Sequence, residues 1–380
     1  MKVLVLYDYP PAPGGLATQG DLLYKGLLEL DVDVHAAHLE SSQEKEWYYR
    51  WFKPDVVVGV GYWGHTPQLV LHPQHHGIQA VPWLVADGYI ANYQDTLNAL
   101  PLILVTSNWV KEMYMRDGIH GDKIHVLPVG CDTDAFIPFS KVDQKILAIR
   151  EALGVSPEQL MILTIGGDAA SKGAQEVMQA LASLDGNITD WKYVCKVWPQ
   201  PRTSTQNSED RRMAEALGIE KNVIYTTNTI SRNFIPYLIG ACDIYAAPSR
   251  LEGFGMPQVE AGACGKPVIG IKAMGMLDTL VDGETAFLAG VAQKIVVNQV
   301  ILGPESGYEE NHKIHFEEPR TVDYRASVPD IAKFLNVLMH DAPLRDKMGM
   351  AGRKRVVAQF DYRIVAKKFV QIINDVLGIQ

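Results

Sequence analysis

The chain repeats one structural plan, and this repeat limits the fold more than any other feature of the sequence. Residues 3–30 read as a buried strand, a loop that ends in Gly14-Gly15, and a helix with leucines on one side. Residues from 160 onward repeat the order, with a glycine-containing loop over residues 166–173. Strands that alternate with helices build parallel sheets covered by helices. We therefore expect an α/β protein with two domains of similar build.

The composition agrees with two domains of ordinary size. The 380 residues are 47% hydrophobic and 21% charged, and the formal net charge of −9 argues against nucleic acid as a partner. The four cysteines are far apart and show no C-x-x-C spacing, so we expect buried thiols in a reducing compartment. No apolar run reaches about 18 residues, and the first strand has no cleavage-like site after it. We expect a cytoplasmic protein, with peripheral attachment at the inner membrane face left open.

The segment 249–260 carries the clearest chemical signal. It follows an apolar strand pattern over residues 243–248 and leads into a predicted helix that has Pro257 in its first turn. Its glycines allow close backbone approach to a ligand, and free N–H groups at a helix start attract anions. Glu252 and Glu260 lie eight residues apart, so both can face one pocket. A phosphate near the N–H groups and a sugar near the carboxylates would fit this loop.

The segment 249–260 resembles the Glu-x7-Glu signature of the retaining glycosyltransferases of family 4, the glycosyl transferases group 1. The likeness includes Glu-Gly-Phe-Gly and the string over residues 265–270, and it extends over nearly the whole chain. It is weakest at residues 60–90 and 291–326. The resemblance implies a GT-B fold, in which two Rossmann-like α/β/α domains face each other across a central cleft.

The resemblance also implies an activity. Such enzymes transfer a sugar from a nucleotide diphosphate sugar to an acceptor hydroxyl and retain the anomeric configuration. A UDP-sugar is the most frequent donor, and GDP- and ADP-sugars also occur. No metal or other cofactor is expected, and the acceptor may be a small molecule, a lipid or a glycan. A homo-oligomer is left open.

The expected domain boundaries follow the same resemblance. The expected segments are an acceptor domain over residues 1–140, a linker over 141–158, a donor domain over 159–358, and a last helix over 359–380 that packs back on the first domain. Residues 291–326 are longer and more polar than the family requires, so we expect an insertion. A hairpin over the cleft and an oligomer contact are both interpretations of this insertion.

The resemblance assigns roles to individual residues of this chain. Glu252 would lie near the sugar and its developing positive charge, and Glu260 would hold the ribose hydroxyls. Lys172 would stabilise the leaving diphosphate together with backbone N–H groups, which is an electrostatic mechanism. The further residues expected around the substrates are Gly14, Gly15, Gly166, Lys196, Asn228, Arg250, Phe254, Gly255, Met256 and Pro257.

Two of the positions that depart from the family pattern bear directly on the candidate site. Gly167 stands where the family has an arginine that acts with the lysine on the diphosphate, so Lys196 or Arg250 is expected to supply the second cation. Asp87 stands where many members have a histidine beside the reacting sugar. Asp87 takes that role, His65 takes it, or the acceptor chemistry differs. A purely structural role for Asp87, as the cap of the next helix, is equally compatible with the sequence.

A few patterns point to different chemistry. Residues 59–64 spell G-x-G-x-x-G, which favours a dinucleotide site, but they do not form the first strand–helix turn and contain bulky Tyr62-Trp63. The histidines at 65, 72, 75 and 76 suggest metal binding, but their segment also resembles a polar loop. Asp132-Thr133-Asp134 suggests a metal-binding D-x-D motif, but this string resembles a family segment that binds no metal. The sequence thus also admits an NAD-dependent oxidoreductase, a nucleotide-sugar epimerase of similar build, or a catalytically weak nucleotide-sugar-binding protein.

Overall fold

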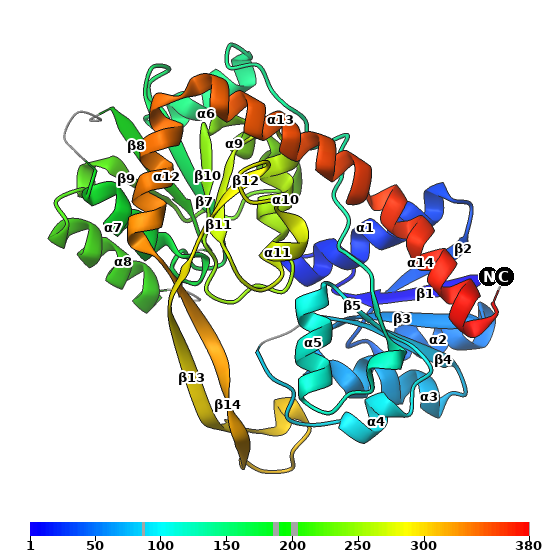
Figure 1. Cartoon of the computed structure of the whole chain (residues 1–380). Coiled ribbons are helices and arrows are strands. Elements are labelled where there is room, and N and C mark those ends of the chain that lie inside the picture. Colours follow the sequence, from blue (N-terminus) through cyan, green and yellow to red (C-terminus); the bar gives the residue numbers. More distant parts are fainter. Residues whose placement is uncertain (86–87, 185–189, 199–203, 380) are drawn as a thin grey trace. The chain divides into compact units, whose positions relative to one another are not determined.

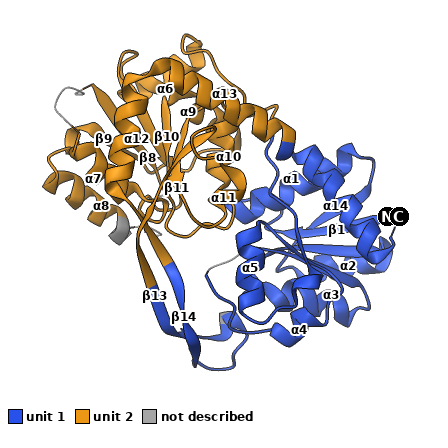
Figure 2. Cartoon of the chain, in the orientation of Figure 1, with its two compact units in different colours: residues 1–132, 296–322, 359–380 blue, residues 133–295, 323–358 orange. Residues whose placement is uncertain are grey.

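A computed structural model describes residues 1–85, 88–184, 190–198 and 204–379. The contacts divide the chain into two units (Figure 2). Unit 1 comprises Met1–Asp132, Val296–Val322 and Gln359–Gln380, and unit 2 comprises Thr133–Ile295 and Asp323–Ala358. The two units are described one after the other.

Unit 1 is built on a six-stranded sheet among its described residues, with every neighbouring pair parallel (Figure 1). The strand order is β2-β1-β3-β4-β5-β6. Continuous runs of buried apolar residues form these strands because helices cover both faces of a parallel sheet. The strands are β1 (Lys2–Tyr7), β2 (Asp33–His38), β3 (Val56–Gly61), β4 (Gln79–Leu84), β5 (Ile103–Val105) and β6 (Ile124–Val126).

The last helix of the chain belongs to unit 1 and packs on its first helix. Gly26 allows the close approach, because a Cβ atom there would lie 2.7 Å from the Cβ of Ala366. Arg363 Nε also pairs with Glu29 Oε2 at 2.8 Å. The helical segments of unit 1 are α1 (Gly15–Glu29), α2 (Ser42–Trp51), η1 (Trp63–His65), η2 (Pro67–Leu71), α3 (His72–His75), α4 (Gln94–Asn98), α5 (Asn108–Arg116), η3 (Gly121–Lys123), η7 (Pro304–Ser306) and α14 (Tyr362–Leu377).

Unit 2 repeats the architecture with a second parallel six-stranded sheet among its described residues, in the order β12-β11-β10-β7-β8-β9. Its strands are β7 (Leu160–Ile165), β8 (Trp191–Lys196), β9 (Val223–Thr226), β10 (Ile244–Ala246), β11 (Val268–Ile271) and β12 (Ala286–Ala289). Its helical segments are α6 (Gln144–Ala152), η4 (Ala170–Lys172), α7 (Ala174–Ala182), α8 (Ser204–Ala216), η5 (Glu220–Asn222), η6 (Arg232–Phe234), α9 (Ile235–Ala241), α10 (Met256–Ala263), α11 (Met276–Thr279), α12 (Val328–His340) and α13 (Ala342–Gln359). The predicted pair of Rossmann-like α/β domains is confirmed.

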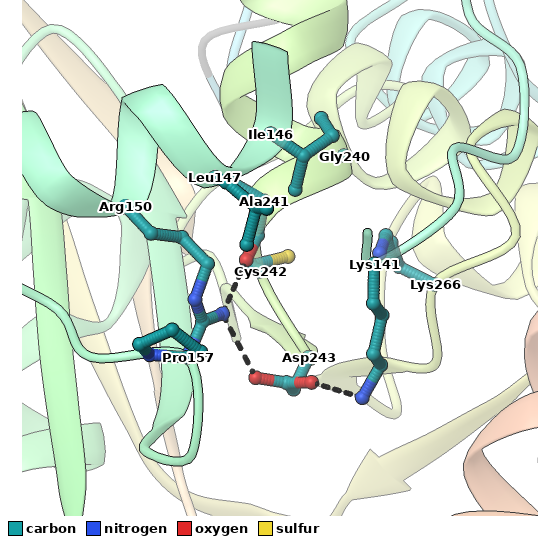
Figure 3. Close-up of a pocket in the computed structure, with 10 residues that line it drawn as sticks. All are labelled: Lys141, Ile146, Leu147, Arg150, Pro157, Gly240, Ala241, Cys242, Asp243 and Lys266. Carbon is teal, nitrogen blue, oxygen red and sulfur yellow. Dashed lines mark hydrogen bonds and ion pairs between the residues drawn. The ribbon is translucent and has the colours of Figure 1, made fainter. Parts of the chain in front are cut away.

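A buried charge cluster joins α6 to the sheet of unit 2. The carboxylate of Asp243 pairs with Arg150 of α6 at 3.3 Å and with Lys141 at 2.7 Å (Figure 3). It also accepts a hydrogen bond from the backbone N–H of Met161 at 2.9 Å. These contacts place residues 133–158, which the sequence suggested as a domain end and a linker, within unit 2.

The expected insertion forms a two-stranded hairpin of β13 (Val291–Leu302) and β14 (His312–Ala326). Residues 296–322 group with unit 1, where the Tyr308 hydroxyl donates to the carbonyl of Ala91 at 2.6 Å. The base of the hairpin groups with unit 2, where the N–H of Tyr324 donates to the carbonyl of Arg250 at 2.7 Å. The hairpin is therefore held at both ends by specific contacts.

Across the described part of the chain, we find no helix with the length and apolar character that a membrane span requires.

Replacing the buried carboxylate of Asp243 by a methyl group tests the charge cluster. We expect Asp243→Ala to lower the free energy of unfolding by about 3 kcal/mol or more, because Arg150 would be left buried without its counter-ion. The matched control is Lys272→Ala, which removes the exposed 3.1 Å pair with Asp282 and should change stability by less than about 1 kcal/mol. Urea unfolding followed by fluorescence measures both. Equal small effects would show that the cluster does not stabilise unit 2.

Candidate active site

The loop between β10 and α10 is held in place by the first turn of the helix that follows it. Gln258 Nε2 donates to the carbonyl of Ala247 at 2.9 Å and to Ser249 Oγ at 3.0 Å. Gly255 precedes the helix with a φ of 89°, a conformation that favours glycine. The predicted strand, glycine turn and helix are therefore present, and Pro257 occupies the second position of α10.

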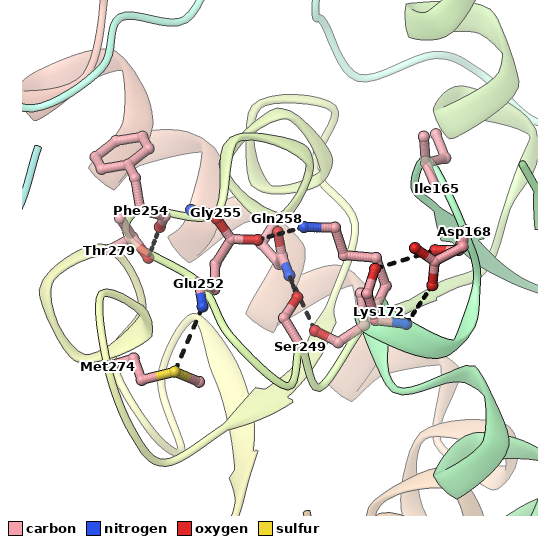
Figure 4. Close-up of polar contacts among 12 residues, drawn as sticks. Ile165, Asp168, Lys172, Ser249, Glu252, Phe254, Gly255, Gln258, Met274 and Thr279 are labelled. Carbon is pink, nitrogen blue, oxygen red and sulfur yellow. Dashed lines mark hydrogen bonds and ion pairs between the residues drawn. The ribbon is translucent and has the colours of Figure 1, made fainter. Parts of the chain in front are cut away.

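Two charged side chains contact each other: Lys172, predicted to act on the donor's diphosphate, and Glu252, predicted to lie near its sugar. Lys172 Nζ lies 2.6 Å from Glu252 Oε2 (Figure 4). The second carboxylate oxygen, Oε1, accepts a hydrogen bond from the N–H of Gly255 at 3.1 Å. Both side chains are mostly buried, with 21% and 15% of their surface exposed. The pair thus presents a preorganised cation and anion side by side in unit 2.

Two glycine loops of unit 2 lie in direct contact because glycines remove the side chains between them. A Cβ atom on Gly173 would fall 2.4 Å from the carbonyl oxygen of Pro248, and one on Gly166 would fall 2.6 Å from Lys172 Cγ. The N–H of Arg250 donates to the carbonyl of Ser171 at 2.9 Å. This close packing of the two loops brings the side chain of Lys172 into contact with that of Glu252.

Gly167 occupies the position where the family has an arginine, and an aromatic ring lies against it. A Cβ atom at this position would meet the ring of Trp198 at 3.1 Å. The N–H of Trp198 also donates to the carbonyl of Gly167 at 2.8 Å. A side chain at position 167 would therefore require Trp198 to shift.

Lys196 is the better placed of the two candidates for the second cation. It ends β8 next to the end of β7, and its carbonyl accepts from the N–H of Gly166 at 3.0 Å. The side chain is buried, and burial lowers the pKa of its ammonium group below the usual range. Among the residues that the structure describes, no carboxylate forms an ion pair with it. Its charge is therefore available to an anionic ligand.

Arg250, the second candidate, forms part of a buried network of hydrogen bonds and ion pairs. Its guanidinium pairs with Glu176 at 3.0 Å and donates to Gln175 Oε1 at 2.8 Å. Gln175 in turn donates to Asp210 Oδ1 at 2.7 Å. Arg250 therefore joins the glycine loop to α7, and its charge is already balanced by a carboxylate.

The second carboxylate of the signature, Glu260, has a partner that sequence reasoning missed. Glu260 is buried on α10 and forms an ion pair with Arg232 of η6. The guanidinium of Arg232 also lies 4.8 Å from the centre of the Phe136 ring. The two ion-paired residues are 28 positions apart and no motif links them, so the sequence offers no signal for this contact.

The remaining residues predicted in unit 2 belong to the same loops and to the loop after β9. Phe254 is buried and its carbonyl accepts from Thr279 Oγ1 at 3.2 Å. Met256 and Pro257 form the first two positions of α10. Asn228 is exposed in the loop after β9. Phe254, Met256 and Pro257 therefore continue the loop that carries Glu252, whereas Asn228 comes from a separate loop.

The residues predicted in unit 1 are described separately. Gly14 precedes α1 and Gly15 begins it, so the glycine loop lies at a helix start as expected. His65 is half-buried against the ring of Tyr62, and burial lowers the pKa of its imidazole. Asp87 lies outside the described residues. Asp132 pairs with Lys25 at 2.7 Å.

The G-x-G-x-x-G string in unit 1 has a packing explanation. A Cβ atom on Gly59 would lie 2.7 Å from a methyl carbon of Leu69, and one on Gly61 would lie 2.5 Å from the His65 ring. These glycines let η2 and the η1 turn pack against β3. The segment that follows is a short 3-10 turn and a π-helix rather than the α-helix of a dinucleotide site.

Fold and loops together define a class of protein, a GT-B-type α/β protein. The crystal structure of Anabaena Alr3699/HepE in complex with UDP and glucose superimposes with a TM-score of 0.75, at 16% identity, over 99% of this chain and 100% of that one. This similarity establishes the fold.

The sequence comparisons match part of the chain to a known family. Residues 145–315, fewer than half of the 380, match the family described as glycosyl transferases group 1. A D-inositol 3-phosphate glycosyltransferase of Acidothermus cellulolyticus is 27% identical over 191 residues, which are 49% of this chain and 41% of that protein. An alpha-maltose-1-phosphate synthase of Mycolicibacterium smegmatis is 21% identical over 82% of this chain and 76% of its own length. The chain spans less than half the length of several curated relatives that it matches.

Asp210 provides a pH test of the network around Arg250. Burial raises the pKa of Asp210 to about 6 from its usual 3.8, so the folded protein binds one more proton than the unfolded chain between these pH values. This contribution to stability is complete below about pH 4 and is lost as the pH rises through 6. We expect the wild type to lose about 3 kcal/mol relative to Asp210→Asn between pH 4 and 7. Parallel pH profiles of the two proteins in urea unfolding would contradict the raised pKa.

Proposed function

We propose that this protein is a retaining glycosyltransferase that transfers a sugar from a nucleotide diphosphate sugar to an acceptor hydroxyl without a catalytic metal. The observation that carries the proposal is the contact between Lys172 and Glu252 at the junction of two glycine loops, with Glu260 eight residues further on. The domain family of residues 145–315 supports the reaction class.

The donor diphosphate would bind at the glycine loops of unit 2. Lys172 would contact the phosphate that leaves, and Lys196 would supply the second positive charge in place of the family arginine. Both lysines adjoin Gly166, since its missing side chain makes room for Lys172 and its N–H donates to the carbonyl of Lys196. Two mostly buried cations stabilise a developing negative charge more strongly than they would in water.

The sugar and the ribose would each contact one carboxylate. Glu252 would stabilise the positive charge that develops at the anomeric carbon. Glu260 would accept hydrogen bonds from the ribose hydroxyls, which would take over from Arg232 as its partners. A buried carboxylate requires such a partner, because an uncompensated buried charge is costly.

The transfer step balances without a dedicated base. The bond between the anomeric carbon and the phosphate oxygen breaks, and its electron pair stays on the phosphate. The acceptor oxygen forms a bond to the same carbon on the same face, which retains the configuration. The acceptor proton passes to the leaving phosphate oxygen.

The comparisons suggest which substrates to test first. A structural neighbour was solved with UDP and glucose, and relatives are named for inositol 3-phosphate and maltose 1-phosphate chemistry. We therefore propose a UDP-sugar as donor and a phosphorylated sugar or cyclitol as the first acceptor class to examine.

Ligand-dependent melting of the purified chain tests this proposal. We expect one of UDP, GDP and ADP to raise the melting temperature in the presence of EDTA, because a ligand that binds only the folded state stabilises it. Stabilisation by NAD alone would overturn the proposal in favour of an oxidoreductase. Incubation with the matching nucleotide sugar distinguishes a transferase from an epimerase, which converts the donor without an acceptor, and from a binding protein, which leaves the donor unchanged.

Substitution of Lys172 and Lys196 tests whether both cations stabilise the leaving diphosphate. We expect Lys172→Met and Lys196→Met each to lower kcat by about 10²–10³-fold, because each removes a group that stabilises the leaving diphosphate. The matched control is Lys192→Met at the opposite end of β8, whose ammonium donates to the carbonyl of Lys221. Initial rates of nucleotide diphosphate release measure all three. An unchanged rate in Lys196→Met would exclude this lysine as the second cation.

A further inference from the structure

Three side chains of types that can bind a metal converge in unit 1, outside the residues proposed for transfer. His72 begins α3 and His76 follows its last residue, so they lie one helical turn apart on the same side. Glu46 comes from α2, an earlier helix of the same unit. One ligand atom from each of the three residues lies within 4.8 Å of the other two.

The donor set is one that transition metals prefer. Imidazole and carboxylate groups bind Zn²⁺ at about 2.0–2.2 Å, which places tetrahedral ligands about 3.3 Å apart. The ligand atoms therefore have to approach one another by at most about 1.5 Å, a change that rotation of partly exposed side chains can supply. Among the described residues, this is the group of at least three His, Cys, Asp or Glu side chains whose ligand atoms lie within 4.8 Å of one another.

The buried side chain of Tyr49 contacts both histidines of the cluster. The hydroxyl of Tyr49 lies 3.4 Å from Nδ1 of His72, and its ring centre lies 5.2 Å from that of His76. A histidine that binds a metal through one nitrogen usually donates its other N–H to such an oxygen. Tyr49 would therefore accept from Nδ1–H and leave Nε2 of His72 as the ligand atom.

The carboxylate of Glu46 forms only a weak, exposed ion pair with Arg50. Arg50 pairs with Glu46 at 3.0 Å, but its side chain is 78% exposed and that of Glu46 is 35% exposed. Exposed pairs four residues apart on a helix contribute only about 0.3–0.5 kcal/mol. A divalent cation would displace Arg50 at small cost, and exposed His76 leaves one side of the cluster open to a water ligand.

We propose that Glu46, His72 and His76 bind a divalent transition-metal cation, Zn²⁺ in the first instance, and so join α2 to α3. A water molecule would complete a tetrahedral site. Because the site shares no residue with the glycine loops of unit 2, its test is independent of the proposed transferase activity.

Titration of the EDTA-stripped, dialysed full chain with Zn²⁺ in a calorimeter tests the site, and the spectrum of the Co²⁺-loaded chain reports its geometry. We expect one equivalent of Zn²⁺ to bind and the Co²⁺ form to show the intense visible bands of tetrahedral coordination. His76→Ala and Glu46→Gln should each weaken Zn²⁺ binding by about 10–100-fold or more. Both residues are at least partly exposed, so these variants should fold, which circular dichroism of the metal-free proteins checks.

The matched control is His75→Ala. His75 is exposed on the same turn and is not part of the converging group, so its loss should change Zn²⁺ affinity by less than about 2-fold. A dissociation constant weaker than about 1 mM in the wild type would overturn the proposal. Equal affinity in His76→Ala, or an equal loss in His75→Ala, would also overturn it, because either result would place the metal on different side chains.

Discussion

A buried guanidinium, that of Arg250, connects the parts of unit 2 on which the candidate site depends. Its side chain pairs with Glu176 and Gln175 of α7, its N–H donates to the carbonyl of Ser171, and its carbonyl accepts from Tyr324 at the base of the hairpin. The glycine loop that carries Glu252 is therefore attached to a helix, to the loop that carries Lys172 and to β14. Because a buried arginine without its carboxylate would be very unfavourable, the pair with Glu176 favours this arrangement of the loop.

The charges of unit 2 divide into two kinds according to burial and partners. Buried ion pairs join Arg150 to Asp243 and Arg250 to Glu176, so these residues help to determine how helices and strands pack. Lys172 and Glu252 are mostly buried and pair with each other between two loops, and Lys196 is a buried cation with a lowered pKa. Groups of the second kind can exchange their partners for a ligand, which is the physical basis for placing the candidate site there.

Several features of the fold could be predicted because they depend on near neighbours in the sequence. Buried runs such as Val56–Gly61 form strands since apolar residues on both faces suit a covered parallel sheet. Gly255 adopts a positive φ before α10, as a glycine turn into a helix requires. The expected linker differed, because the helix over Gln144–Ala152 buries Arg150 against Asp243, a contact that its polar composition did not indicate.

The sequence by itself determined the alternation of strands and helices, the two glycine loops of unit 2 and the eight-residue spacing of Glu252 and Glu260. These are local properties, since backbone conformation and spacing along a helix depend on adjacent residues. Only the tertiary structure decided which side chains come together: Arg232 with Glu260, Arg250 with Glu176, and Glu46 with His72 and His76. Such contacts join residues that are distant in the chain, so they depend on how whole helices pack, and no short pattern encodes that packing.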